Sequence, residues 1–94
     1  FLQGILVDKK ILPSHFKNDK KIKNWFEYIS KNKLNPINET FCFINNNKFI
    51  KRVVIGVRSK DQLNEILSQM VNKKTFNYSI FKNKNLNIID PRRW

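Results

Sequence analysis

Arg58 and Ser59 are the residues of this chain whose types and position best suit the binding of an anion. They follow an apolar run, Val53–Val57, and precede a segment with the polar and apolar pattern of a helix. The start of a helix leaves its first backbone N–H groups without intrahelical partners, and the helix dipole adds positive potential there. A phosphate is therefore the expected ligand, held by these N–H groups and by the Arg58 guanidinium.

The segment that positions this pair, residues 51–67, predicts a strand, a tight turn and a helix. The apolar run at about 51–57 lacks alternation, which is typical of a buried parallel strand. Ser59 and Gln62 have the spacing of a capping box, in which each side chain bonds a backbone N–H at the helix start. The helix should turn a stripe of apolar side chains toward a core, formed by Leu63, Ile66, Leu67, Met70 and Val71.

Earlier in the chain, the patterns predict a second strand and two more helices. Gly4–Val7 is a short apolar run that predicts a buried strand. A helix is expected from about Asn18 to Lys33, and Asn35-Pro36 gives the cap and first residue of the next helix, which the asparagines at 45–47 end. The apolar face of the helix over 18–33 consists of Ile22, Trp25, Phe26 and Ile29.

Two strands joined by helices predict a parallel pair with a right-handed crossover, because the long helical connection excludes a hairpin. This pattern suits a barrel and a doubly wound sheet equally well. After Lys73-Lys74 the periodicity is lost, and residues 75–94 are expected to form an irregular tail.

On these segments the chain resembles the aldo/keto reductases. The run 51–67 is similar to the last strand and helix of that family, where the turn grips the adenosine 2′-phosphate of NADP. FLQGIL at 1–6 looks like the penultimate strand, and IIDPRRW at 88–94 resembles the tail of one bacterial branch. The resemblance implies an α/β fold, with residues 1–94 as a C-terminal fragment of a (β/α)8 TIM barrel: the last two strand–helix units and the tail 75–94. Because the sequence starts at Phe1 in a predicted strand, earlier strands are expected to be missing.

The resemblance also implies where NADP would bind. The turn that would run along the nicotinamide ribose and pyrophosphate consists of Phe1, Leu2, Gln3 and Gly4. Gly4 would either allow close approach of the backbone to the cofactor or let a helix pack nearby. The residues that would surround the adenosine end are Gly56, Arg58, Gln62 and Glu65. The family usually has Glu-Asn in this helix, whereas Ile66 follows Glu65 here, so one adenine-facing amide is missing.

No catalytic residue is expected in these 94 residues. The family is known for an Asp, a Tyr, a Lys and a His that act together, and earlier strands contribute all four. The one histidine, His15, lies in a predicted turn, and Cys42 suits a small buried hydrophobe. No Cys/His spacing typical of a metal site occurs. The whole enzyme would transfer a hydride between NADPH and an aldehyde, ketone or sugar carbonyl, and this chain alone is expected to be inactive.

The formal net charge of +12 supports an alternative, a free-standing basic module that binds nucleic acid or an acidic partner. The lysines are spread among Asn, Ile and Phe residues, which favours a surface composition set by an A/T-rich genome, so nucleic-acid binding is not favoured. A single cysteine and the lack of a membrane-length apolar stretch favour the cytoplasm and no membrane partner. The unpaired sheet edges of a partial barrel predict self-association with another copy.

Overall fold

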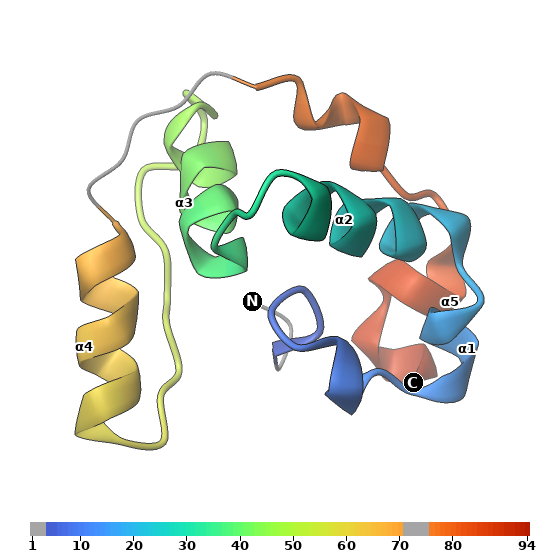
Figure 1. Ribbon diagram of the computed structural model, residues 1–94, viewed down its shortest axis with the longest axis horizontal. Coiled ribbons are helices and arrows are strands. Elements are labelled where there is room, and N and C mark those ends of the chain that lie inside the picture. The colour runs from blue at the N-terminus through green and yellow to red at the C-terminus, as the bar shows by residue number, and fades with distance from the viewer. Residues whose placement is uncertain (1–3, 71–75) are drawn as a thin grey trace. The chain divides into compact units, whose positions relative to one another are not determined.

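The computed structural model describes residues 4–70 and 76–94, and in these ranges it contains helices and turns but no β-strand (Figure 1). The chain divides into two units, one made of Phe1–Lys33 with Asn77–Trp94 and one of Leu34–Phe76. The predicted α/β fold and its interpretation as part of a TIM barrel are therefore wrong, because the described residues build no parallel sheet.

The first unit consists of short helical elements that accompany the longer helix α2. Its elements are η2 (Lys9–Ile11), α1 (Ser14–Lys17), α2 (Lys20–Lys31), η3 (Tyr78–Phe81), α5 (Leu86–Ile89) and η4 (Pro91–Arg93). Helix α2 begins after Asp19, whose Oδ1 accepts hydrogen bonds from the backbone N–H groups of Lys21 at 2.8 Å and Ile22 at 3.1 Å. This cap fixes where α2 starts, because it satisfies two donors that lack intrahelical partners.

The core of the first unit joins residues from both ends of the sequence. Its buried members are Ile5, Leu12, Phe16, Ile22 and Ile88, with Leu6, Phe26 and Trp94 packed against them. Trp25 is also buried, and its indole Nε1 donates to the carbonyl of Leu6 at 2.8 Å. The predicted apolar face of α2 is confirmed at Ile22 and Trp25, whereas Phe26 and Ile29 are only partly buried.

Residues 4–7 form a turn, and the strand predicted there is wrong. Gly4 has a φ of 85°, and its carbonyl accepts hydrogen bonds from the N–H groups of Val7 at 2.8 Å and Asp8 at 3.0 Å. A Cβ at this position would lie 3.1 Å from Cδ1 of Ile11. Glycine suits the turn because a positive φ is costly for residues with a side chain.

The predicted irregular tail contributes short helical elements to the first unit over residues 77–94. The Lys21 ammonium donates to the carbonyl of Ile80, and the Asn83 amide donates to Oδ1 of Asp19 at 2.9 Å. The rings of Phe16 and Trp94 meet edge-to-face with their centroids 5.1 Å apart. These contacts tie the end of the sequence to α1 and to the start of α2.

Asp90 caps η4 and binds the guanidinium of Arg92. Its Oδ1 accepts from the backbone N–H of Arg92 at 3.1 Å, and the Arg92 guanidinium contacts the two carboxylate oxygens at 2.9 Å each. The side-chain bond from Arg92, followed by its backbone bond, lowers the pKa of Asp90 below its ordinary value of 3.8. A fork of two parallel bonds favours the charged carboxylate over the neutral acid.

We expect the pKa of Asp90, followed through its carboxyl carbon by NMR, to lie below 3.8 and to move up toward that value in Arg92→Ala. Because the folded-state pKa is lowered, the charged cap stabilises the fold above the ordinary pKa, and this contribution disappears as the pH falls through the lowered pKa. Lys84→Ala is the control, since it removes a cation that forms no ion pair with Asp90. An unchanged pKa in Arg92→Ala would contradict the assigned cause.

The second unit consists of α3 (Pro36–Asn45), α4 (Lys60–Gln69) and the segment between them (Figure 1). The predicted cap of α3 is confirmed, because Oδ1 of Asn35 accepts from the N–H groups of Ile37 at 2.9 Å and Asn38 at 3.2 Å. The Asn38 amide donates to the carbonyl of Gln69 at 2.8 Å and so joins α3 to the end of α4. Cys42 is fully buried, as expected for a small hydrophobe.

Two predictions for the second unit are wrong. Residues 51–57 form no strand, since no described residue pairs with their backbone. The apolar stripe of α4 faces a core only at Ile66, which is 8% exposed. The stripe residues exposed to solvent are Leu63, Leu67 and Met70. The fifth member, Val71, lies outside the described residues. Helical spacing predicts a common face correctly, but whether that face is covered depends on the elements around it.

Candidate phosphate-binding site at the start of α4

The sequence around Ser59 folds into the predicted capping arrangement, with one difference in its bonding. The Ser59 hydroxyl accepts from the backbone N–H of Gln62 at 3.2 Å. The Gln62 side chain returns to the backbone N–H of Arg58 at 2.8 Å, one residue before the position that a capping box uses. This second bond fixes the backbone of Arg58 against the first turn of α4.

The first turn of α4 also leaves backbone donors open to solvent. The N–H of Leu63 bonds the carbonyl of Ser59 at 3.2 Å, whereas the N–H groups of Lys60 and Asp61 have no partner within the part of the chain that the structure describes. All three residues are exposed. Free donors at a helix start, together with the dipole of a ten-residue helix, favour a bound anion.

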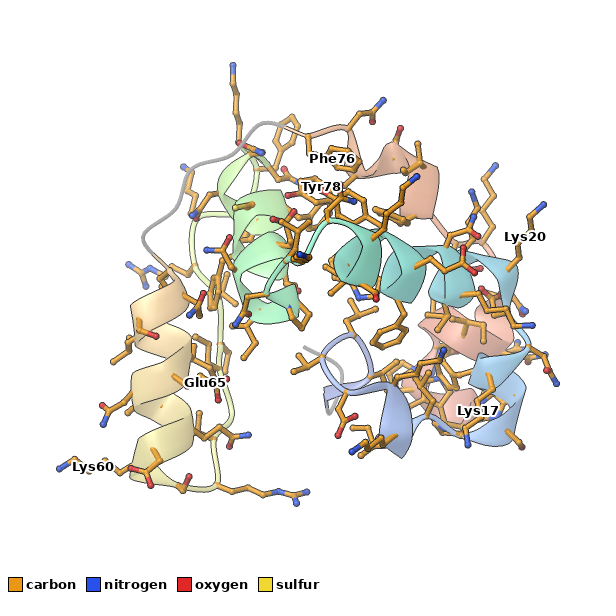
Figure 2. The ribbon with its side chains drawn as sticks, in the orientation of Figure 1. Lys17, Lys20, Lys60, Glu65, Phe76 and Tyr78 are labelled. Atoms are coloured by element: carbon orange, nitrogen blue, oxygen red, sulfur yellow. The ribbon has the colours of Figure 1, made fainter. Side chains whose placement is uncertain are left out.

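The charges at this helix start are mixed. Arg58 and Lys60 are exposed and form no ion pair with any described residue. Figure 2 shows the Lys60 side chain extending outward from the first turn. Asp61, in the same turn, competes with an external anion for the positive end of the helix. The start of α4 thus carries two cations, one carboxylate and two N–H groups without partners among the described residues, which makes it a candidate anion site.

The structure brings together only part of the predicted cofactor site. Arg58, Gln62 and Glu65 lie at the start and along the first turns of α4, where Figure 2 labels Glu65. The Gln62 carbonyl oxygen already accepts from Arg58, which leaves the amide Nε2 as its donor for a ligand. Gly4 belongs to the other unit, where it serves the turn at 4–7. The remaining three predicted residues, Phe1, Leu2 and Gln3, lie outside the described residues.

The structure adds two facts about the site that the sequence patterns did not provide: the open space around Gly56 and the place of Lys60 in the first turn of α4. A Cβ built on Gly56 would meet no atom within 4 Å, so packing among the described residues does not require glycine there. The bare backbone leaves space next to Arg58 for a ligand. Lys60 was absent from the predicted site, although its place as the first residue of α4 was a signal that could have identified it.

Other chemistry-bearing residues do not assemble into a second site in the part of the chain described. His15 is exposed in α1, with its ring centroid 4.6 Å from that of Phe16. No group of three or more His, Cys, Asp or Glu side chains among the described residues could hold a metal ion. A pocket of about 970 Å³ lies beside α2 and η3, and its lining includes Phe26, Glu27 and Ile80. The lining mixes apolar side chains with charged and polar ones, among them Lys9 and Lys31, so it points to no particular ligand.

No helix among the described residues has both the length and the apolar character needed to cross a bilayer. Comparisons of the chain with protein-family models, with curated proteins and with solved structures found no match.

Proposed function

We propose that this chain binds the adenosine 2′-phosphate end of NADP, as the cofactor-binding part of a cytoplasmic oxidoreductase similar to the aldo/keto reductases. The observation that carries the proposal is the exposed Arg58, fixed by Gln62 beside the free N–H groups of α4. The proposed reaction is hydride transfer between NADPH and an aldehyde, ketone or sugar carbonyl. Its catalytic groups would come from residues other than those of this sequence.

Each part of the site has a distinct role in this proposal. The Arg58 guanidinium pairs two of its N–H groups with the 2′-phosphate oxygens, a geometry that the point charge of a lysine does not offer. The N–H groups of Lys60 and Asp61 donate to the same phosphate. Gln62 uses its Nε2 toward the adenine, and Gly56 lets the nucleotide approach the backbone. The carboxylate of Asp61 opposes the phosphate and limits the affinity.

We expect the chain to bind adenosine 2′,5′-bisphosphate about tenfold or more tightly than adenosine 5′-monophosphate, because hydrogen bonds to a charged phosphate contribute about 1.5–3 kcal/mol. NMR titration of the labelled chain gives both dissociation constants, and the amide signals of Lys60 and Asp61 should shift most. Equal affinities, or shifts confined to the first unit, would contradict the proposal.

A second candidate function, binding to nucleic acid, rests on the lysines of the first unit. Lys17, Lys20 and Lys23 are exposed, Figure 2 shows Lys17 and Lys20 on α1 and α2, and none of the three forms an ion pair with a described residue. The nearby carboxylate of Asp19 is engaged in capping α2. Duplex DNA added in the same titration separates the two functions. Its binding would shift α1 and α2 signals and weaken steeply with salt, since it releases counterions.

A further inference from the structure

Residues 51–57, hereafter the 51–57 segment, have side chains that alternate as in a β-strand, but they pair with no other described segment. Figure 1 shows this part of the chain as an extended trace in the connection between α3 and α4. No backbone N–H or carbonyl of the segment forms a hydrogen bond with a described residue. The last bonded group before it is the N–H of Ile50, and the first after it is the N–H of Arg58.

The exposure of the side chains alternates along the segment. Val53 and Val57 are each 39% exposed and Ile55 is partly buried, whereas Val54 between them is 99% exposed. Successive side chains of an extended strand point to opposite faces, so one face of the segment is partly covered and the other is bare. This alternation agrees with the extended trace in Figure 1, along which the backbone groups have no partner among the described residues.

A second strand is the kind of partner that this surface fits. The Val-Val-Ile composition has high β-propensity, and a row of free donors and acceptors is a template for strand addition. A helix laid on the segment would cover its apolar side chains but leave these backbone groups unpaired. An added strand satisfies both, because main-chain bonds provide affinity and alternate side chains provide specificity.

The charges at the two ends of the 51–57 segment determine which charges the added strand should carry. Lys51 and Arg52 precede the apolar run, and Arg58 follows it; all three are exposed. A second copy of the segment, paired antiparallel about Ile55, would place Arg52 opposite Arg58, and like charges directly opposite each other are destabilising. An incoming strand with acidic residues at its ends avoids this repulsion and gains two attractive pairs.

We propose that the 51–57 segment binds an extended segment of a partner protein, apolar in its middle and acidic at both ends, as an added β-strand. This interaction surface shares Arg58 with the proposed cofactor site, but its pairing uses the backbone and side chains of residues 51–57 rather than the N–H groups in the first turn of α4, and the peptide is titrated without cofactor. A synthetic peptide of alternating valine and threonine with two glutamates at each end is the probe.

The test is calorimetric titration of this peptide into the chain, with hydrogen exchange of the amides of the 51–57 segment measured by NMR. We expect saturable binding and slowed exchange. Adjacent N–H groups point to opposite edges of a strand, so Val53→Pro and Val54→Pro together probe both edges. One of the two should weaken binding at least tenfold, whereas Val54→Thr, which keeps the N–H and the β-branch, should bind as the wild type does. Neither proline removes a hydrogen bond between described residues.

Charge reversal tests the acidic ends of the partner. Arg52→Glu should weaken the binding of the glutamate-ended peptide and strengthen the binding of a lysine-ended one. Lys23→Glu in α2 makes the same change in net charge and should alter the affinity for neither peptide. No binding of the peptide, wild-type affinity in both proline variants, or equal responses of the two charge variants would overturn the proposal. A dimer of the chain alone that Val54→Pro dissociates would replace the acidic partner with a second copy.

Discussion

Replacing Trp25 with alanine is expected to destabilise the first unit by about 3–5 kcal/mol, the range typical of aromatic residues truncated in a core. Trp25 is 6% exposed, and its ring meets that of Phe81 edge-to-face with centroids 5.3 Å apart. Its indole also donates to the carbonyl of Leu6. The truncation therefore removes ring packing between α2 and η3 and leaves a carbonyl without its donor.

Urea denaturation, followed by NMR signals from α2, measures this loss. Trp25→Phe keeps an aromatic ring but loses the bond to Leu6, so it should cost less than the alanine variant. Lys23→Ala, on the exposed side of α2, is the matched control and should change stability by about 0.5 kcal/mol or less. If Trp25→Ala were no more harmful than Lys23→Ala, the placement of Trp25 in the core would be wrong.

Local signals in the sequence predicted the helix starts well. The caps at Asn35 and Ser59 form as expected, because a short polar side chain and the N–H groups it bonds are close neighbours in the chain. The cap of α2 at Asp19 works in the same way, although the sequence patterns placed the start of this helix only at about Asn18 and did not identify its cap. The apolar face of α2 was predicted because residues three and four apart share one side of any helix.

Features that depend on distant partners were predicted poorly. An apolar run such as 53–57 is typical of a buried strand, but a strand exists only where another segment supplies the ladder, and no described residue does so. The same holds for α4, where Leu67 shares the face of Ile66 yet is 50% exposed. At Gly4 the error is local, because its positive φ and the bonds that its carbonyl accepts build a turn where the apolar residues that follow favoured a strand.

The part of the candidate site that consists of neighbouring residues was predicted, whereas the part that required residues distant in the sequence was not. Arg58 and Gln62 lie four residues apart at one helix start, so their proximity follows from helical geometry. Gly4 was grouped with them by resemblance, and the structure places it in a separate unit. The bond from the Arg58 N–H to Gln62 depends on side-chain rotamers, which spacing alone does not predict.

Arg58→Ala is expected to weaken NADPH binding about ten- to a hundredfold in dissociation constant while leaving NADH binding nearly unchanged. Only NADPH carries the 2′-phosphate that the guanidinium would hold, and a hydrogen bond to a charged group contributes about 1.5–3 kcal/mol. The affinity of Arg58→Lys for NADPH should fall between those of the wild type and the alanine variant, because lysine keeps the charge but loses the fork of parallel donors. Fluorescence titration of both cofactors gives the four dissociation constants for each comparison.

Two further variants separate a cofactor contact from a general effect of charge or folding. Arg52→Ala removes an exposed arginine from the same unit and should leave both cofactors unaffected. Gln62→Ala should weaken both, since it removes the proposed adenine contact and the bond that fixes the Arg58 backbone. Equal losses for NADPH and NADH in Arg58→Ala, or the same loss in Arg52→Ala, would mean that Arg58 acts only through the overall positive charge. A loss confined to NADPH and to Arg58 is the result expected when the guanidinium holds the 2′-phosphate.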